Sequence, residues 1–404
     1  MSVVPSINLY SRDDDTINST AAVLLVLYEL VAEERGIAPD QLRGTVQNDI
    51  LKEYIARGTY IYPPVQSLRL TIDLMAYCHE RLPQWNTISI SGYHMREAGS
   101  TAVQELAFTF ANAIEYVRRA QASGMGIEAL GPRLSFFFNA QMDLLEEVSK
   151  FRAARRLWFR IATELLGARD ELTPKLRFHV QTAGSALAAQ QADVNIVRVT
   201  LQALAAVFGG AQSLHTNGFD EALGLPSERA ATLALRTQQV IGFESGIPAA
   251  VDPFGGSYEV EERTNMLEFA AWEELMKILD RGGAVACIED GYQQRSIEDA
   301  ALGYARAVDI SERVIVGVNR FTDDVASVPP VLFDPELECS QVTSLHAFRA
   351  RRDALVCSEA LARVESVAAG TENIVPTLRA ALKAGATIGE VSNALRRQWG
   401  EHHP

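Results

Sequence analysis

Five short segments with the pattern of a strand that carries polar residues recur along the chain, and a helical pattern follows each of them. They are residues 43–47, 88–94, 133–138, 176–181 and 211–217. The clearest one opens with the alternation Ile88-Ser89-Ile90-Ser91 and precedes apolar residues spaced by three or four positions from Val103 to Val117. Strands that alternate with long amphipathic helices form right-handed βαβ units around a parallel sheet. Five such units in succession favour an α/β fold of the (β/α)8 TIM-barrel type over an open sheet.

The predicted strands carry polar side chains where a barrel normally packs hydrocarbon. An ordinary barrel fills its centre with layers of bulky branched residues. With the two-residue period of a strand, one face here instead carries small or hydrogen-bonding groups. These are Thr45, Gln47, Ser89, Ser91, His179, Gln181, Ser213 and His215. The pattern predicts a barrel with a partly hollow, polar axis that admits a long ligand.

The length of 404 residues suits a barrel with a smaller appendage. We expect the barrel over residues 1–320, with a short strand near residues 7–10 and a last strand over residues 314–318. Residues 321–343 contain Pro329, Pro330 and Pro335 with little periodicity and are predicted to be a linker. Residues 344–404 are predicted to form a small helical tail that packs on the barrel or on a partner.

Composition and charge restrict the partners of the chain. The net charge is −14, from 37 basic and 51 acidic residues, which argues against general affinity for nucleic acid or an anionic membrane. The apolar run over residues 21–32 is too short to span a bilayer and lacks a positive leader. The four cysteines have no CxxC spacing and are expected to be reduced thiols, so we expect a cytoplasmic protein.

Three histidines mark a candidate site at the carboxyl ends of the predicted strands, where barrels place their active sites. His94, His179 and His215 are joined there by Gln47, Gln181 and Asn217. The alternative for each histidine is a core position satisfied by neighbouring backbone. The sequence has no HxxxH or carboxylate-rich metal motif and no GxSxG nucleophile elbow. Neutral donors of this kind suit a pocket that holds a polar substrate while a cofactor carries the difficult step.

Four charged residues extend this site, and three of them, Arg57, Glu97 and Glu221, have a structural alternative. Arg57 could pair bidentately with a carboxylate, or could be a surface arginine on an exposed helix. Arg133 could hold an anion. Glu97 and Glu221 could accept hydrogen bonds from ribose hydroxyls, or could cap the starts of helices.

Several long motifs in order resemble one known family. They are the segments GTVQNDILKEY (44–54), YIYPP (60–64), SISGYH (89–94) and QSLHTN (212–217). The chain is similar over residues 16–321, and more weakly through the tail, to the large catalytic chain of the methylmalonyl-CoA mutase family. The resemblance implies a barrel that threads coenzyme A along its axis and an adenosylcobalamin cofactor. It also implies radical migration of the acyl-CoA thioester group to the neighbouring carbon.

The resemblance also implies roles for individual residues. His94 would hydrogen-bond the thioester carbonyl, Gln47 would contact the substrate, and Tyr93 would shield the radical pair. Arg57 would pair with a substrate carboxylate. The remaining assignments fall into two groups: Thr45, Val46, Arg133, Leu134, Ser135, His179 and Ser213 would line the substrate and coenzyme A channel, and Glu97, Gln181, Asn217 and Glu221 would face the adenosyl group or the corrin.

An arginine at position 57 matches a substrate with a free carboxylate, so the expected reaction interconverts methylmalonyl-CoA and succinyl-CoA. The alternatives are isobutyryl-CoA or a related branched acyl-CoA as substrate, or a non-catalytic relative that binds acyl-CoA or scaffolds a mutase. Compared with the family, the first barrel strands and the Asp-x-His-x-x-Gly loop of the cobalamin domain are missing from this sequence. We therefore expect an incomplete barrel, a separate cobalamin-binding small subunit that supplies the cobalt ligand, and a G-protein chaperone as a further partner.

Overall fold

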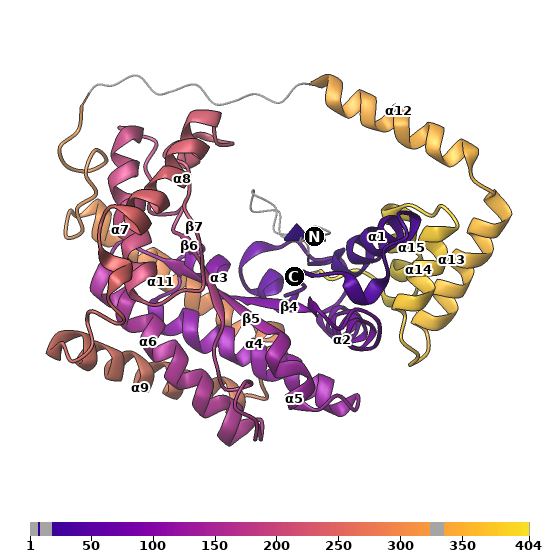
Figure 1. Ribbon diagram of the computed structural model, residues 1–404, viewed down its shortest axis with the longest axis horizontal. Helices are drawn as coiled ribbons and strands as arrows, with labels where there is room; N and C mark the ends of the chain where they lie inside the picture. The colour runs from indigo at the N-terminus through magenta and orange to yellow at the C-terminus, as the bar shows by residue number, and fades with distance from the viewer. Residues whose placement is uncertain (1–6, 9–17, 324–334, 404) are drawn as a thin grey trace.

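The computed structural model describes residues 7–8, 18–323 and 335–403 as a helix-rich α/β protein (Figure 1). All strand pairs are parallel, in the orders β1-β2-β3 and β4-β5-β6-β7. The strands are β1 (Ile7–Asn8), β2 (Gly44–Thr45), β3 (Trp85–Asn86), β4 (Ile88–Ser91), β5 (Leu134–Ala140), β6 (Phe178–Thr182) and β7 (Ser213–His215). The five strand segments expected from the sequence, and the short strand near residue 7, are confirmed.

The two groups of strands are joined through the chain around Thr87, which separates β3 from β4. The amide of Val46 donates to the carbonyl of Asn86 at 3.2 Å, and the amide of Ser89 donates to the carbonyl of Gln47 at 2.9 Å. The extension of β2 therefore pairs with β3 and then with β4, so the parallel pairing runs from β1 to β7. This part of the expected architecture is confirmed, while a closed (β/α)8 barrel stays a prediction.

Helices follow the strands, as the alternating pattern predicts, and most of them are long. They are α1 (Ala21–Glu34), α2 (Pro64–Arg81), α3 (Tyr93–Glu97), α4 (Ala102–Ala122), α5 (Ile127–Leu130), α6 (Leu144–Arg160), α7 (Asn195–Phe208), α8 (Glu228–Phe243), α9 (Tyr258–Asp280), α10 (Ala284–Glu289) and α11 (Tyr292–Asp309). The helix expected after Ile88 is α4. It begins at a capping box in which Thr101 accepts from the amide of Gln104. Glu53–Arg57 forms a π-helical turn.

One face of the sheet packs on helices and the other does not share that core. Ile88, Ile90, Phe136, Phe138, Phe178 and Val180 lie in one apolar cluster with side chains of α4 and α6. Phe110 of α4 contacts the rings of Phe136 and Phe138. Because successive residues of a strand point to opposite faces, the polar residues between these positions point away from the helices. The hydrophobic core thereby fixes which side of the sheet is free to form a site.

The prediction of a last strand over residues 314–318 is wrong. This segment is a turn with one isolated bridge between Val316 and Arg320. The side chain of Asn319 accepts from the amide of Ile315 at 2.7 Å and donates to the carbonyls of Val308 and Arg313 at 2.8 Å. Gly317 has a φ of 82°, which a β-strand cannot accommodate. These local bonds outweigh the strand preference of the valines and isoleucine.

The helical tail is present and packs on the first third of the chain. It comprises α12 (Pro335–Arg351), α13 (Ala354–Ala368), α14 (Val375–Lys383) and α15 (Ile388–Trp399), so α12 begins within the residues expected to be a linker. Apolar side chains of α13, α14 and α15 share one cluster with α1 and α2. Arg69 of α2 donates to the carbonyls of Val367, Ala368 and Glu372 at 2.8–3.1 Å. The domain limits at residues 320 and 344 stay predictions.

No helix among the described residues is long and apolar enough to cross a membrane.

Candidate active site

Strand register builds a polar surface on the face of the sheet opposite to the helices. Ser89 lies opposite Ser135. The next row runs across four strands and contains Ser91, Phe137, His179 and Ser213, and the row nearest the carboxyl edge contains Asn139, Gln181 and His215. The hydroxyl and imidazole groups expected on one face therefore do lie on one face. Phe137 is the single aromatic interruption within these rows of described residues.

Gln47 and His94 are the two site residues expected to touch the acyl group, and both keep a buried nitrogen unsatisfied within the described part of the chain. Gln47 is 1% exposed, and its Oε1 accepts from Asn18 at 3.2 Å. His94 is 4% exposed, and its Nδ1 lies 2.8 Å from Ser91 Oγ. Among the described residues, neither Gln47 Nε2 nor His94 Nε2 has a hydrogen-bond partner. A buried unpaired nitrogen costs about 1–3 kcal/mol, so each of these two nitrogens is a candidate donor to a polar ligand.

Two cations lie close to His94. Lys52 Nζ is 3.1 Å from His94 Nδ1. Burial, and then the charges of Lys52 and Arg57, hold the pKa of His94 well below its usual value. Arg57 ends the π-helical turn, which stops at Gly58 with a φ of 76°. Arg57 is half-buried on a turn whose preceding residues are buried, so it is not a surface arginine on an exposed helix.

Tyr93 closes one side of this centre. Its ring is 1% exposed and stacks on Phe137, with ring centres 4.8 Å apart and planes 5° apart. The same ring lies nearly perpendicular to the ring of His94, with 5.2 Å between their centres. The pair of rings forms an apolar wall that excludes water from the histidine.

Glu97 anchors a second cluster at the carboxyl edge of the sheet. Its Oε1 accepts from Asn139 Nδ2 at 2.7 Å and from Ser185 Oγ at 3.0 Å, and its Oε2 accepts from the amide of Ser185 at 2.8 Å. Gln181 Nε2 donates to Asn217 Oδ1 at 2.9 Å. Glu97 lies on α3 without capping a longer helix, so its alternative role as a cap is not the one observed.

The side chains of Glu97, Asn217 and Glu221 surround Gly184. A Cβ at Gly184 would lie 3.1 Å from Glu97 Oε2, 3.2 Å from Asn217 Nδ2 and 3.6 Å from Glu221 Cγ. A cleft of about 600 Å³ continues from Glu221 and His215 along α8. The four residues expected to face a cofactor, Glu97, Gln181, Asn217 and Glu221, are therefore neighbours beside an open cleft.

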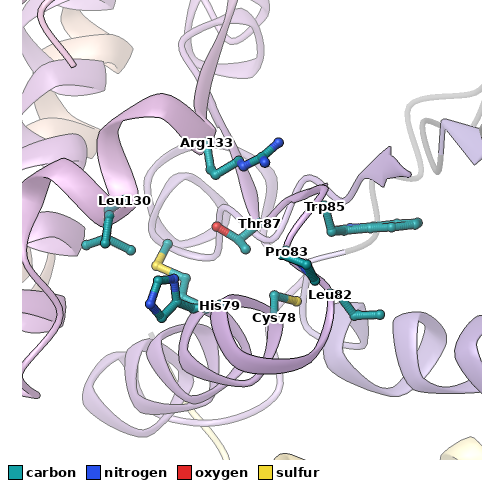
Figure 2. A pocket seen from close by; sticks show the side chains of 10 residues that line it. Cys78, His79, Leu82, Pro83, Trp85, Thr87, Leu130 and Arg133 are labelled. Carbon is teal, nitrogen blue, oxygen red and sulfur yellow. The ribbon is translucent and has the colours of Figure 1, made fainter. Parts of the chain in front are cut away.

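At the amino edge of the sheet, Arg133 borders a cleft of about 240 Å³ between α2 and α5 (Figure 2). Figure 2 shows Thr87 in the middle of this cleft, with Cys78 and His79 on the α2 side, Leu130 to the left and Arg133 above. Thr87 Oγ1 is buried without a partner among the described residues. Arg133 directly precedes β5, whose seven residues span about 20 Å. The two ends of the predicted channel thus lie at opposite edges of one sheet.

Comparison with known proteins decides the family. A family model described as methylmalonyl-CoA mutase matches residues 14–401. The chain belongs to the methylmalonyl-CoA mutase family. The resemblance expected from the four sequence motifs is thereby confirmed.

Two relatives whose names state different activities have the same sequence identity to this chain. The chain is 44% identical over 390 residues to the 2-hydroxyisobutanoyl-CoA mutase large subunit of Aquincola tertiaricarbonis, covering 96% of this chain and 69% of that protein. It is 44% identical over 386 residues to methylmalonyl-CoA mutase of Escherichia coli K12, and this match covers 94% of this chain and 53% of that protein. It is 40% identical over 390 residues to the human mitochondrial methylmalonyl-CoA mutase, and this match covers 96% of this chain and 52% of that protein. The chain thus spans between about half and two thirds of these relatives, and identity alone does not choose the substrate.

Two residues expected to line the coenzyme A channel of the family point elsewhere. The side chains of Val46 and Leu134 are 0% and 3% exposed and lie in the apolar clusters behind the sheet. Only their backbone can face a ligand. Thr45 and Ser135 are half-buried, and their hydroxyls bond to Asn86 Nδ2 at 3.0 Å and to the carbonyl of Ile88 at 2.9 Å.

The three histidines do not form one contiguous group. His179 is the second residue of β6, below the carboxyl end expected for it, and its Nδ1 lies 2.7 Å from Ser213 Oγ. Phe137 stands between His94 and His179, with ring centres 5.8 and 5.0 Å away. Burial and then the neighbouring His215 lower the pKa of His179 to about 3. His179 is thus a neutral group along the expected channel rather than at its end.

Sequence reasoning missed three buried polar residues that support the centre. Lys52 is 0% exposed and pairs with Glu53 at 2.9 Å. Asp49 is also 0% exposed, and it accepts from the amide of Ser91 at 2.7 Å and from Tyr116 Oη at 2.6 Å. Asn18 links the two through its bonds to the amide of Asp49 and to Glu53. Charges set within the apolar run around Ile50 and Leu51 were the available signal, because charged residues are rarely buried unless they are paired.

Proposed function

We propose that this chain is the acyl-CoA-binding catalytic chain of a cobalamin-dependent mutase that interconverts methylmalonyl-CoA and succinyl-CoA. The observation that carries the proposal is the buried, unpaired Nε2 of His94 beside Arg57 and Gln47, on a motif shared with the family. A thioester carbonyl needs a hydrogen-bond donor, and a substrate carboxylate needs a cation. The site offers one of each, because the charge of Arg57 lies near enough to His94 to lower its pKa.

Each residue has a role that its surroundings support. Arg57 binds the substrate carboxylate, because burying a carboxylate without a cation costs several kcal/mol. His94 donates to the thioester carbonyl and Gln47 Nε2 orients the acyl group. Tyr93, held flat against Phe137, keeps water away from the reacting carbons. Thr45, Arg133, Ser135, His179 and Ser213 contact coenzyme A along the polar face, with Val46 and Leu134 contributing backbone only.

The residues around Gly184 fit a nucleoside-bearing cofactor. Carboxylate and amide oxygens of Glu97, Gln181, Asn217 and Glu221 can accept from ribose hydroxyls, and the absence of a Cβ at Gly184 leaves room between them. When bound there, adenosylcobalamin supplies the radical chemistry that the side chains lack. The described residues hold no cluster of three or more His, Cys, Asp or Glu groups placed for a metal ion. We also propose that a separate subunit binds the cobalamin, that a G-protein chaperone loads this subunit, and that the assembly works in the cytoplasm.

Isomerisation in a reconstituted assembly tests this function. The chain is mixed with adenosylcobalamin and a cobalamin-binding subunit, and conversion of methylmalonyl-CoA to succinyl-CoA is followed by chromatography. We expect turnover that falls by about 10²–10³ in His94→Ala, as removal of a donor to a reacting carbonyl does elsewhere. Isobutyryl-CoA and 2-hydroxyisobutanoyl-CoA are run in parallel. Tight binding of these acyl-CoA esters without isomerisation of any of them would overturn the proposal in favour of a binding or scaffolding relative.

A further inference from the structure

The contact between Lys52 and His94 joins two buried side chains from different units of the sheet. Lys52 follows β2 and His94 follows β4, and their nitrogens Nζ and Nδ1 are 3.1 Å apart. Lys52 is 0% exposed, and its charge is paired with Glu53 at 2.9 Å. Glu53 is in turn held by Asn18 Nδ2 at 2.6 Å and by the hydroxyl of Thr59. The ammonium is therefore fixed by its own partners and does not depend on the histidine for its place.

An ammonium group has donors only, and each ring nitrogen of a neutral imidazole is either a donor or an acceptor. With Lys52 against it, Nδ1 of His94 must be the acceptor, because an Nδ1–H would point a positive hydrogen toward a positive charge. The ring proton then lies on Nε2, the nitrogen without a partner among the described residues. Ser91 Oγ, 2.8 Å from the same Nδ1, is compatible with this arrangement as a second donor.

We propose that Lys52 is a positioning residue that fixes His94 as the neutral Nε2–H tautomer and so aims a hydrogen-bond donor at the substrate. This inference rests on the proposed function for the identity of the group that receives the bond. Lys52 does not touch the substrate. It acts through His94, by deciding which nitrogen carries the hydrogen.

The same geometry determines the charge of the ring. His94 is surrounded by Lys52, Arg57, Tyr93 and Phe137, so the two charged groups that face it are both cations. Burial and these cations hold the pKa of His94 well below its usual value. His94 therefore stabilises the carbonyl by a hydrogen bond and does not deliver a proton to it.

Ring nitrogen shifts test the inference without substrate or cofactor. The full chain is labelled with ring-15N histidine, and His94 is identified by the signals lost in His94→Gln. We expect a protonated Nε2 and an unprotonated Nδ1 in the wild type. In Lys52→Met we expect the proton to move to Nδ1, where it donates to Ser91 Oγ, and the pKa of His94 to rise. Ser91→Ala and the exposed Lys175→Met should both keep the wild-type pattern.

Two results would overturn the inference: an Nδ1–H tautomer in the wild type, or an unchanged tautomer and pKa of His94 in Lys52→Met. If Lys52→Met fails to fold because Glu53 loses its partner, the double variant Lys52→Met with Glu53→Gln replaces it. The wild-type and Ser91→Ala spectra remain decisive on their own. A chain with the Nε2–H tautomer but no turnover would contradict the proposed function alone, and turnover by a chain with the Nδ1–H tautomer would contradict the role of Lys52 alone.

Discussion

Asn139 Nδ2 donates a hydrogen bond of 2.7 Å to Glu97 Oε1, and the backbone of Asn139 is held on both sides by a buried ion cluster. Its amide donates to Glu105 Oε1 at 2.8 Å, and its carbonyl accepts from Lys150 Nζ at 2.7 Å. Lys150 also binds Glu105 Oε2 at 2.6 Å, with both side chains 0% exposed. The orientation of the Glu97 carboxylate thus depends on charges behind the sheet.

We expect Lys150→Met to lower the free energy of unfolding by about 3–5 kcal/mol, because Lys150 makes the closest ion pairs with the buried carboxylates of Glu105 and Glu147, and Arg96 is more distant from both. Denaturant unfolding monitored by circular dichroism measures the change. The control is Lys277→Met, which removes a 63% exposed lysine from an ion pair with Glu274. That exposed pair should contribute about 0–1 kcal/mol. Equal losses in the two variants would contradict the structural importance of the buried cluster.

Arg57→Gln should select between substrates. For an acyl-CoA with a free carboxylate, we expect binding to weaken by about 2–5 kcal/mol, as truncation of one partner of a buried charge pair does. For isobutyryl-CoA, which has no such carboxylate, binding should change little. Calorimetric titration of methylmalonyl-CoA and isobutyryl-CoA into the wild type and the variant measures both.

The matched control for Arg57 is Arg119→Gln, which changes an arginine 48% exposed on α4 and paired with Glu115. It should leave both affinities unchanged. Weakening of both ligands by Arg57→Gln to the same extent would contradict the selector role, and unchanged binding of both would favour a monocarboxylic substrate.

Asp49 should produce a defined pH dependence of stability. Burial raises its pKa from a usual value of 3.8 to about 6. The folded state therefore binds a proton in this interval that the unfolded state has released, so the stability due to Asp49 is present below about pH 4 and is lost as the pH rises through 6. The loss is roughly 3 kcal/mol at 1.36 kcal/mol per pH unit of displacement.

Asp49→Asn removes this titration while keeping the shape of the side chain. We expect the difference in unfolding free energy, wild type minus variant, to decrease by about 2 kcal/mol of this total between pH 4 and pH 6.5. Chemical denaturation at a series of pH values gives the difference directly. A difference that stays constant over this range would show that Asp49 is ionised throughout, and would contradict its burial as a neutral acid.

Much of the candidate site could be predicted from the two-residue period of the strands. Two of the wrongly expected channel residues are explained by the same period. The alternation Ser89-Ile90-Ser91 correctly predicts one polar face, and Gln181 and His215 join it through parallel register. Val46 and Leu134 were included through family resemblance at the level of motifs, although a strand must turn alternate side chains into the core. A sequence motif includes every residue of a strand, whereas only every second side chain of that strand faces the binding surface.

The contacts that were missed are those made between units. Lys52 and His94 are 42 residues apart, and no local pattern indicates that their nitrogens meet. Local structure also decided against the strand expected at residues 314–318, where Asn319 bonds three backbone groups and forms a turn. Propensity predicted elements well where tertiary packing agreed with it, and poorly where a single polar side chain satisfied the backbone first.

Leu378→Ala tests whether the tail belongs to the same folding unit as the first helices. Leu378 on α14 is 0% exposed in the cluster that α13, α14 and α15 share with α1 and α2. We expect its truncation to lower the free energy of unfolding by about 2–5 kcal/mol, and Leu355→Ala, 69% exposed on α13, to change it by less than about 0.5 kcal/mol. If the tail and α1 unfold together, Leu378→Ala shifts one cooperative transition measured by fluorescence and circular dichroism alike. A separate early transition that alone responds to Leu378→Ala would show instead that the tail is an independent domain, because a shared apolar core cannot be lost on one side only.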